Sequence, residues 1–256
     1  MQQIAVAAGH LSLAGAAGDL WRRADAAFRH MLTVQPAPPQ WLAIGACALA
    51  LVLVVSARAW PLARTVVTIV HEGGHAVVAL ATGQRRVRIR LYRDTAGETR
   101  SRGRRDGVGV TLTAAAGYPA PALVGLGAAA LLAIGHLTAM LLLGLVFLIA
   151  LAFAVRNPYG LLAVIVTAAG VAAVCLYASP VVQAGFGYVM TWFLLFGSLR
   201  PVIELQRDRR AGRGWRSDAD QLARLTSVPG GAWVVLFGLI AVAALAVSAT
   251  WLLIRI

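Results

Sequence analysis

The sequence predicts an all-α polytopic membrane protein with about seven transmembrane helices and a small β-hairpin between the second and the third. In the 256-residue chain 59% of the residues are apolar and only 13% are charged, and the mean hydropathy is +0.76. A soluble domain is nearer half apolar and a quarter charged. Because each span takes about 20 residues, the composition excludes a large soluble domain, a disordered chain and a coiled coil.

The charge of the chain points to a membrane surface. All 23 basic residues are arginine, and the formal net charge is +13. These arginines cluster in short segments between apolar runs, as the positive-inside rule expects of cytoplasmic loops, so we predict contact with the lipid bilayer and no nucleic-acid partner. Cys47 and Cys175 lie inside apolar runs and indicate neither a disulfide framework nor a cysteine metal site.

The first 40 residues differ from the rest and are predicted to form an N-terminal cytoplasmic or interfacial segment, followed by a transmembrane domain over residues 41–256. Residues 24–32 could form a short interfacial helix, and a proline-rich run follows at 35–39. A cleaved signal peptide fits poorly, because the arginines follow the first apolar stretch instead of preceding it.

The apolar runs predict seven spans. They cover residues 41–57, 64–82, 112–134, 137–155, 159–178, 182–199 and 232–254. Basic loops at 83–109 and 200–216 carry nine and six arginines respectively. With both loops inside, the positive-inside rule predicts a multi-pass protein of the inner (cytoplasmic) membrane with its N-terminus in the cytoplasm and its C-terminus outside.

The first basic loop has a strand pattern. Residues 86–92 alternate between polar and apolar side chains, which is the period of a half-buried strand. Residues 107–113 alternate in a similar way, and residues 94–97 supply turn-forming side chains between the two stretches. We therefore predict a β-hairpin beside the membrane, built from 86–92 and 107–113.

The second predicted span contains the chemistry-bearing motif His71-Glu72-Gly73-Gly74-His75, an HExxH pattern. On a helix the two histidines lie on one face, so both imidazoles can bind one metal ion. Zinc suits this ligand set, and Glu72 is placed to take a proton from a water at the metal. The alternative is a pair of histidines that hydrogen-bond neighbouring helices. The two glycines also allow close helix packing.

A catalytic zinc usually has a third protein ligand, and the chain contains only ten acidic residues. Asp218 is the preferred candidate. Ser217 and Asp220 have the spacing of a capping box, which would occupy Asp220 and leave Asp218 free, although Asp220 stays open as the ligand. His136 is the remaining candidate, but its place near a predicted span boundary favours an interfacial residue.

Three segments together resemble the site-2 protease class, most closely the compact bacterial B-type branch without a PDZ domain. They are the HExxH segment, the Gly117-Tyr118-Pro119 segment and the Ser217-Asp218-Ala219 segment. The similarity covers roughly residues 60–240. It implies intramembrane peptide-bond hydrolysis with Zn²⁺ as the cofactor, His71 and His75 as ligands and Glu72 as the general base.

One segment departs from that family's pattern. Many site-2 proteases carry Asn-Pro-Asp-Gly, whose aspartate is the third ligand, whereas this chain has Asn157-Pro158-Tyr159-Gly160. A phenol is a poor ligand at neutral pH, so the ligand has moved to Asp218 or zinc binding is weakened. Asn157 is predicted to bind substrate or an oxyanion, with helix capping as the alternative.

Two further segments are predicted to receive substrate. Gly117-Tyr118-Pro119 lies inside the third predicted span, where Pro119 and Pro121 prevent a regular helix. The simple interpretation is a kink, and the functional one is a widened cleft in which Tyr118 contacts substrate. The predicted strand at 108–112 could pair with an unwound substrate by β-addition.

These observations predict an integral membrane zinc metalloendopeptidase that cleaves peptide bonds in or near transmembrane segments of membrane-protein substrates. By analogy, such a substrate is a single-span regulatory protein, for example an anti-sigma factor. The alternative is a catalytically inactive pseudoprotease or membrane-protein-binding scaffold. A small-solute transporter is less favoured, because the sequence shows no paired half-repeats.

Overall fold

The computed structural model describes residues 18, 22, 25, 33–103, 106–212 and 217–254. Of the interfacial helix predicted at 24–32, only Asp25 is among the described residues, and the rest lies outside them. The helices are α2 (Gln40–Val55), α3 (Trp60–Ala81), α4 (Val108–Ala116), α5 (Pro119–Ala133), α6 (Leu137–Ala152), α7 (Pro158–Tyr177), α8 (Pro180–Arg210), α9 (Asp218–Thr226), α10 (Gly230–Ala249) and the π-helix Thr250–Ile254, and the strands are β1 (Arg85–Leu91) and β2 (Gly97–Arg102).

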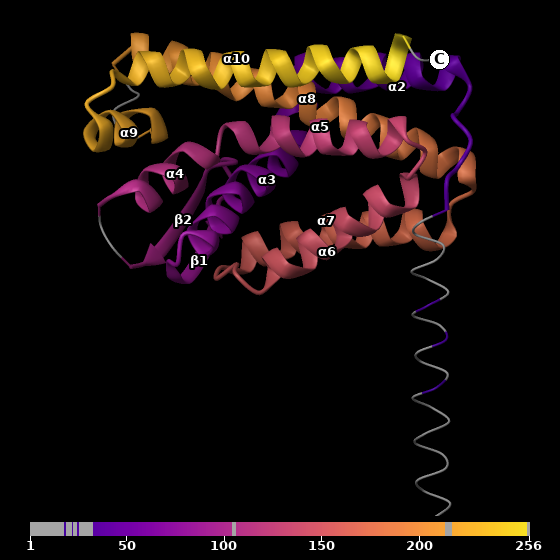
Figure 1. The fold of residues 1–256 in the computed structure, drawn as a ribbon, viewed down its shortest axis with the longest axis horizontal. Coiled ribbons are helices and arrows are strands. Elements are labelled where there is room, and N and C mark those ends of the chain that lie inside the picture. Colours follow the sequence, from indigo (N-terminus) through magenta and orange to yellow (C-terminus); the bar gives the residue numbers. More distant parts are fainter. Residues whose placement is uncertain are drawn as a thin grey trace, which may run out of the picture.

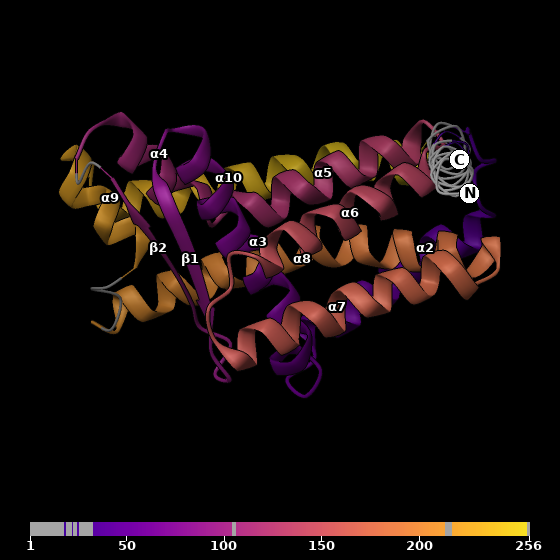
Figure 2. The same cartoon turned by 90° about the horizontal axis from the view of Figure 1, so that it is seen from below.

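The helices form an elongated bundle with a distinct end. Helices α2, α5, α6, α7, α8 and α10 run along the long axis, as Figures 1 and 2 show. The hairpin, α4 and α9 gather at the left end of both views, and α3 runs obliquely toward them. The HExxH motif of α3 is therefore close to the only sheet found in the described part of the chain.

The structure has fewer candidate membrane spans than the seven predicted. Among the described residues, three helices are long and apolar enough to cross a membrane: α7, α8 and α10 with the π-helix. Two bent pairs raise the count to five, since α2 and α3 meet at 101° and α4 and α5 at 68°. Seven separate spans are not confirmed. The polar residues of α3, among them Arg64 and the HExxH motif, lower the hydropathy of that helix, and α6 has only 16 residues.

The proline-rich segment lies far from the hairpin. The N–H of Gln35 donates to the Gly135 carbonyl (2.8 Å), and its side-chain amide donates to the Thr138 hydroxyl (2.6 Å). Both partners lie where α5 joins α6, whereas the other end of α6 contacts the hairpin. Residues 33–39 are consequently at the opposite end of the bundle from the hairpin (Figure 1).

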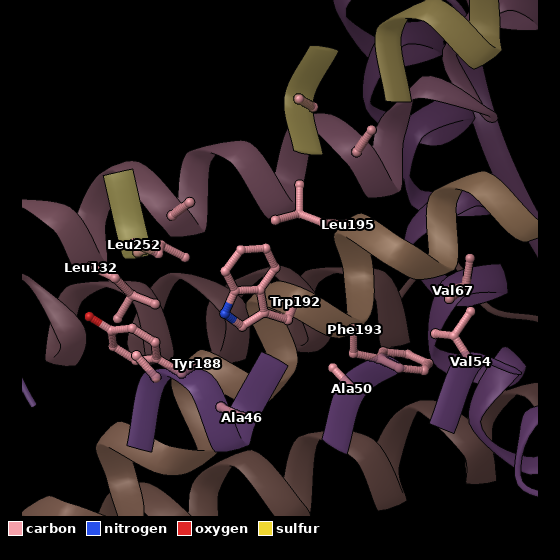
Figure 3. Close-up of a cluster of buried hydrophobic side chains, with 14 of the residues drawn as sticks. Ala46, Ala50, Val54, Val67, Leu132, Tyr188, Trp192, Phe193, Leu195 and Leu252 are labelled. Carbon is pink, nitrogen blue, oxygen red and sulfur yellow. The ribbon is translucent and has the colours of Figure 1, made fainter. Parts of the chain in front are cut away.

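The largest core cluster is built around α8. Trp192 and Phe193 of this helix are each 1% exposed and lie against the small residues Ala46 and Ala50 of α2, as Figure 3 shows. Small side chains let two membrane helices approach closely. The cluster also takes in Leu132, Leu195 and Leu252, so α2, α5, α8 and the C-terminal π-helix share one core.

Strand β1 confirms the prediction for residues 86–92. Its apolar residues Val87, Ile89 and Leu91 are buried and its arginines are exposed. It pairs antiparallel with β2, and on its other side the N–H of Ile89 donates to the Ala154 carbonyl (2.9 Å) while its carbonyl accepts from the N–H of Arg156 (2.9 Å). The segment between α6 and α7 thus covers one edge of the hairpin, and β2 forms the other edge.

The second predicted strand is wrong. Residues 97–102 form β2, and the stretch 107–113 forms most of α4 instead. The hydroxyls of Thr111 and Thr113 donate to the carbonyls of Gly107 and Gly109 (3.3 and 2.8 Å), the i−4 bonds of a helix. The hypothesis that residues 108–112 bind substrate by β-addition is therefore also wrong, because these residues are helical.

The second predicted basic loop is also partly wrong, because α8 continues through Pro201 to Arg210. Ion pairs support this extension. Glu204 pairs with Arg200 on its own helix (3.1 Å) and with Arg64 of α3 (3.1 Å), and the Arg200 guanidinium lies 4.7 Å from the centre of a Trp60 ring. Helix α8 is therefore tied to α3 beyond the predicted end of its span.

Close packing at Gly74 gives a first prediction. A Cβ at this position would lie 2.9 Å from the Ala116 carbonyl oxygen, so Gly74→Ala should push α3 away from the α4–α5 junction. Overpacking of this kind costs about 1–3 kcal/mol. We expect a lower Tm in detergent, measured by intrinsic fluorescence. Gly144→Ala is the matched control because a Cβ there has nothing within 4 Å, and an equal loss in both variants would contradict the prediction.

Candidate metal centre

The helical spacing of the HExxH motif brings its two imidazoles together. His71 and His75 are one turn apart on α3, their Nε2 atoms are 3.2 Å apart, and their rings meet edge to face at 84°. Glu72, between them in sequence, is 4% exposed. The motif thus presents two nitrogen donors and a buried carboxylate at the hairpin end of the bundle.

Asp218 completes a triangle of donors. Its Oδ2 atom lies 3.2 Å from the Nε2 atom of His71 and 3.2 Å from that of His75. A tetrahedral zinc ion with bonds of 2.0–2.1 Å needs ligand–ligand separations of about 3.3 Å. The three donors therefore fit zinc in spacing and in chemistry, and they are the one such group of three found among the described residues.

The start of α9 decides which aspartate faces the histidines. The predicted cap is confirmed: Ser217 Oγ accepts from the N–H of Asp220 (3.3 Å) and donates to its carboxylate (2.7 Å). Asp220 also pairs with Arg209 of α8, so the structure engages it elsewhere. Burial would raise the pKa of Asp218, but the imidazoles of His75 and His71 outweigh it and hold that pKa below its ordinary value. The carboxylate is accordingly ready to bind a cation.

Helix α4 orients one of the two histidines. His75 Nδ1 lies 2.6 Å from the Thr113 carbonyl oxygen. A carbonyl only accepts, so Nδ1 carries the proton and Nε2 keeps its lone pair for a metal. The segment that was predicted to be a strand thus fixes the tautomer of a candidate ligand.

The hairpin holds Glu72. The Thr99 hydroxyl of β2 donates to Glu72 Oε2 (2.5 Å), and a Cβ on Gly97 would lie 2.6 Å from Glu72 Cγ. Sequence reasoning missed both residues. Strand β2 reads Gly-Glu-Thr-Arg-Ser-Arg, and since it has no apolar alternation, hydrophobic periodicity could not have revealed it.

The two predicted substrate contacts are placed differently. Tyr118 lies edge-on to His71 (centroids 4.9 Å apart) and stacks on Phe237 (5.2 Å), so it belongs to the site. Asn157 does not: its side-chain amide accepts from the Leu91 N–H (3.1 Å) and donates to the Leu91 carbonyl (2.6 Å). Its alternative role as a helix cap is confirmed in position only: Asn157 is the N-cap residue of α7, but its side chain makes no cap bond.

A cavity of about 500 Å³ joins these groups. Its wall contains His71, Glu72, His75 and Asp218, together with Thr99 of the hairpin, Tyr118, and Arg64 of α3. Residues from α3, β2, α4 and α9 line one space, although they are far apart in the sequence. The arrangement can hold a divalent metal next to a buried carboxylate in the wall of a partly open cavity.

A family model described as Peptidase M50B-like matches residues 44–248. The chain belongs to this family. The matched region contains the HExxH motif, Tyr118 and Asp218, and it confirms the resemblance to site-2 proteases. Comparisons with curated proteins and with solved structures gave no match. Membership indicates a membrane metalloprotease, and M50 peptidases are zinc enzymes.

In this M50B-like peptidase Gly117 makes room for the candidate ligands. A Cβ there would lie 2.6 Å from both Cε1 and Nε2 of His71. Gly117→Ala should therefore displace the imidazoles and weaken zinc binding by about 10- to 100-fold, measured by competition with a chromogenic chelator. Gly127→Ala, where a Cβ meets nothing within 4 Å, should bind zinc like the wild type. Unchanged affinity in Gly117→Ala would show that the metal lies elsewhere.

Proposed function

We propose that this protein is an integral membrane zinc metalloendopeptidase that cleaves peptide bonds in or near transmembrane segments of other membrane proteins. The observation that carries the proposal is the triangle of His71, His75 and Asp218 donors with 3.2 Å sides next to buried Glu72. Family membership supports a metalloprotease, and the apolar helices support a membrane location.

The residues of the chain divide the chemistry between them. Zinc held by His71, His75 and Asp218 would supply a Lewis acid that polarises the scissile carbonyl and makes water more acidic. Glu72 takes the proton from the attacking water and passes it to the leaving amine. The Thr99 hydroxyl bonds one carboxylate oxygen of Glu72, which leaves the other for this proton. The Tyr118 ring packs edge to face with the His71 ring and restricts the rotation of that imidazole.

Strand β2 is the element best placed to receive substrate. Its partner β1 is bonded on both edges, whereas no further strand pairs with β2 in the described part of the chain. Gly97 and Thr99 of β2 contact Glu72, so an extended peptide that pairs with this edge would lie beside the base. β-Addition of this kind needs a locally unwound substrate helix, and it replaces the incorrect hypothesis for residues 108–112.

We infer that the hairpin end of the bundle faces the cytoplasm and that the protein is in the inner membrane. The hairpin and the end of α8, both rich in arginine, gather there (Figure 2), as the positive-inside rule expects, and the N–H of Arg156 bonds Ile89 of the hairpin. The predicted cytoplasmic N-terminus depended on two separate crossings by α2 and α3. If this bent pair is one crossing, residues 33–39 lie on the opposite side.

Metal removal tests the proposed function. The purified protein, in lipid or detergent, should cleave single-span membrane proteins, and 1,10-phenanthroline should abolish cleavage because without the metal the scissile carbonyl is not polarised and the water that Glu72 deprotonates is less acidic. Stoichiometric zinc should restore it, with cleavage followed by mass spectrometry of the fragments. Cleavage that persists without metal contradicts the proposal. If the zinc-loaded protein binds such spans without cutting them, the scaffold alternative is correct.

A further inference from the structure

The hairpin has a second face that the proposed chemistry does not use. Arg88 pairs with Arg100 across the two strands, and Arg90 pairs with Glu98, so these side chains share the face opposite to Val87, Ile89 and Leu91. Arg156 joins them, since its N–H bonds Ile89 at the edge of β1. We call Arg88, Arg90, Arg100 and Arg156 the arginine platform.

The positive charge of the platform exceeds the negative charge beside it. Glu98 is the one carboxylate that shares this face of the hairpin, and it pairs with Arg100 (2.7 Å). Among the described residues, no ion pair joins Arg88, Arg90 or Arg156 to an acidic side chain. The four platform arginines and Glu98 line a hollow of about 390 Å³. An anion in this hollow would meet several guanidinium groups at once, which is the geometry that Arg offers to phosphate.

The surface next to the platform is apolar and exposed. Arg156 comes two residues before α7, a candidate span with a mean hydropathy of 2.3 of which only 11% is buried. Phe153, Leu162 and Ile165, near the platform end of α6 and α7, are 76%, 60% and 51% exposed. A phospholipid whose acyl chains lie along α7 would therefore bring its headgroup to the arginines.

We propose that the arginine platform binds the phosphodiester headgroup of an anionic phospholipid. Arg156 lines the hollow and lies two residues before the apolar helix α7, and this favours a lipid over an acidic peptide or a nucleic acid, neither of which needs an apolar surface nearby. Because the opposite face of the hairpin holds Glu72 through Thr99, a bound lipid also braces the strand that positions the proposed base. The site itself requires neither zinc nor peptide cleavage.

Binding can be measured on the full chain in nanodiscs or detergent. The probe is fluorescent phosphatidylglycerol, with phosphatidylcholine as the uncharged comparison and glycerol phosphate as the soluble source of phosphate. The test variant is the triple substitution Arg88→Gln, Arg90→Gln and Arg156→Gln. The matched control removes three exposed arginines outside the platform by Arg58→Gln, Arg210→Gln and Arg224→Gln, so that the net charge is the same.

We expect phosphatidylglycerol to bind the wild type and the control variant and to raise their Tm. Each arginine near an anionic surface contributes roughly fivefold to affinity, so the platform variant should bind about a hundredfold more weakly. Glycerol phosphate alone should bind poorly, because it lacks the chains that contact α7. Equal binding of both lipids, equal loss in both triple variants, or preference for a polyglutamate peptide over the lipid would overturn the proposal. Because no outcome depends on cleavage, failure here leaves the proposed function standing.

Discussion

Replacement of Glu72 by glutamine is expected to abolish peptide cleavage while zinc binding stays intact. Glutamine keeps the size of the side chain and can still accept the Thr99 hydroxyl bond, but it cannot take a proton from water. General-base catalysis contributes about 10²- to 10⁴-fold, and the loss here should reach the upper end because the other carboxylates of the cavity wall are engaged: Asp218 is the candidate ligand and Glu98 pairs with Arg100. The measurement is cleavage of a single-span substrate at matched zinc content.

Thr99→Val is the companion variant, since it removes the bond to Glu72 but leaves the carboxylate in place. It should lower kcat by less than Glu72→Gln does. Equal cleavage of a genuine substrate by the wild type and Glu72→Gln would show that another group is the base. An effect of Thr99→Val as large as that of Glu72→Gln would mean that the hairpin positions substrate and not only Glu72.

Removal of the Asp218 carboxylate should have the largest effect on the metal. In Asp218→Ala the donor triangle loses one corner, and the two imidazoles, 3.2 Å apart, are left as the only ligands among the described residues. Zinc affinity should fall by at least about 100-fold, since a stable catalytic site uses three protein ligands. Zinc content after dialysis against a weak chelator, measured by atomic emission, gives the answer directly.

Asp220→Asn is the matched control, because Asp220 lies two residues away on the same helix but engages Ser217 and Arg209. This variant should keep zinc, with at most a modest loss of affinity from a looser α9. If Asp220→Asn loses zinc and Asp218→Ala retains it, the ligand assignment is reversed. Loss in both variants together with a collapsed Tm would indicate that α9 as a whole has detached, and circular dichroism would detect it.

The parts of the fold that hydrophobic periodicity controls were predictable. Strand β1 was identified because Val87, Ile89 and Leu91 are buried on alternate positions. Residues 107–113 misled because two of the polar positions in the pattern are glycines, which have no side chain to place on a face. Strand β2 was missed for the opposite reason: its inward residue Thr99 packs against a carboxylate, so burial there does not require an apolar side chain.

The candidate site was predictable where the spacing of residues within one helix fixes the geometry. His71 and His75 must share a face on any helix, and the capping pattern at Ser217 left Asp218 free. The roles of Thr113 and Thr99 depend on contacts between segments 38 and 27 residues away from their partners, which no local pattern encodes. Asn157 was predicted to contact substrate but instead bonds Leu91. This contact joins two segments that are far apart in the sequence, so no local pattern could reveal it.

The candidate metal donors come from positions 71, 75 and 218 of the 256-residue chain. During synthesis the first two emerge early, and the third follows only after most of the bundle has been inserted. A nascent or prematurely terminated polypeptide that stops short of α9 has an incomplete coordination sphere. The order of the sequence therefore delays completion of the candidate metal site until most of the surrounding helices have been made.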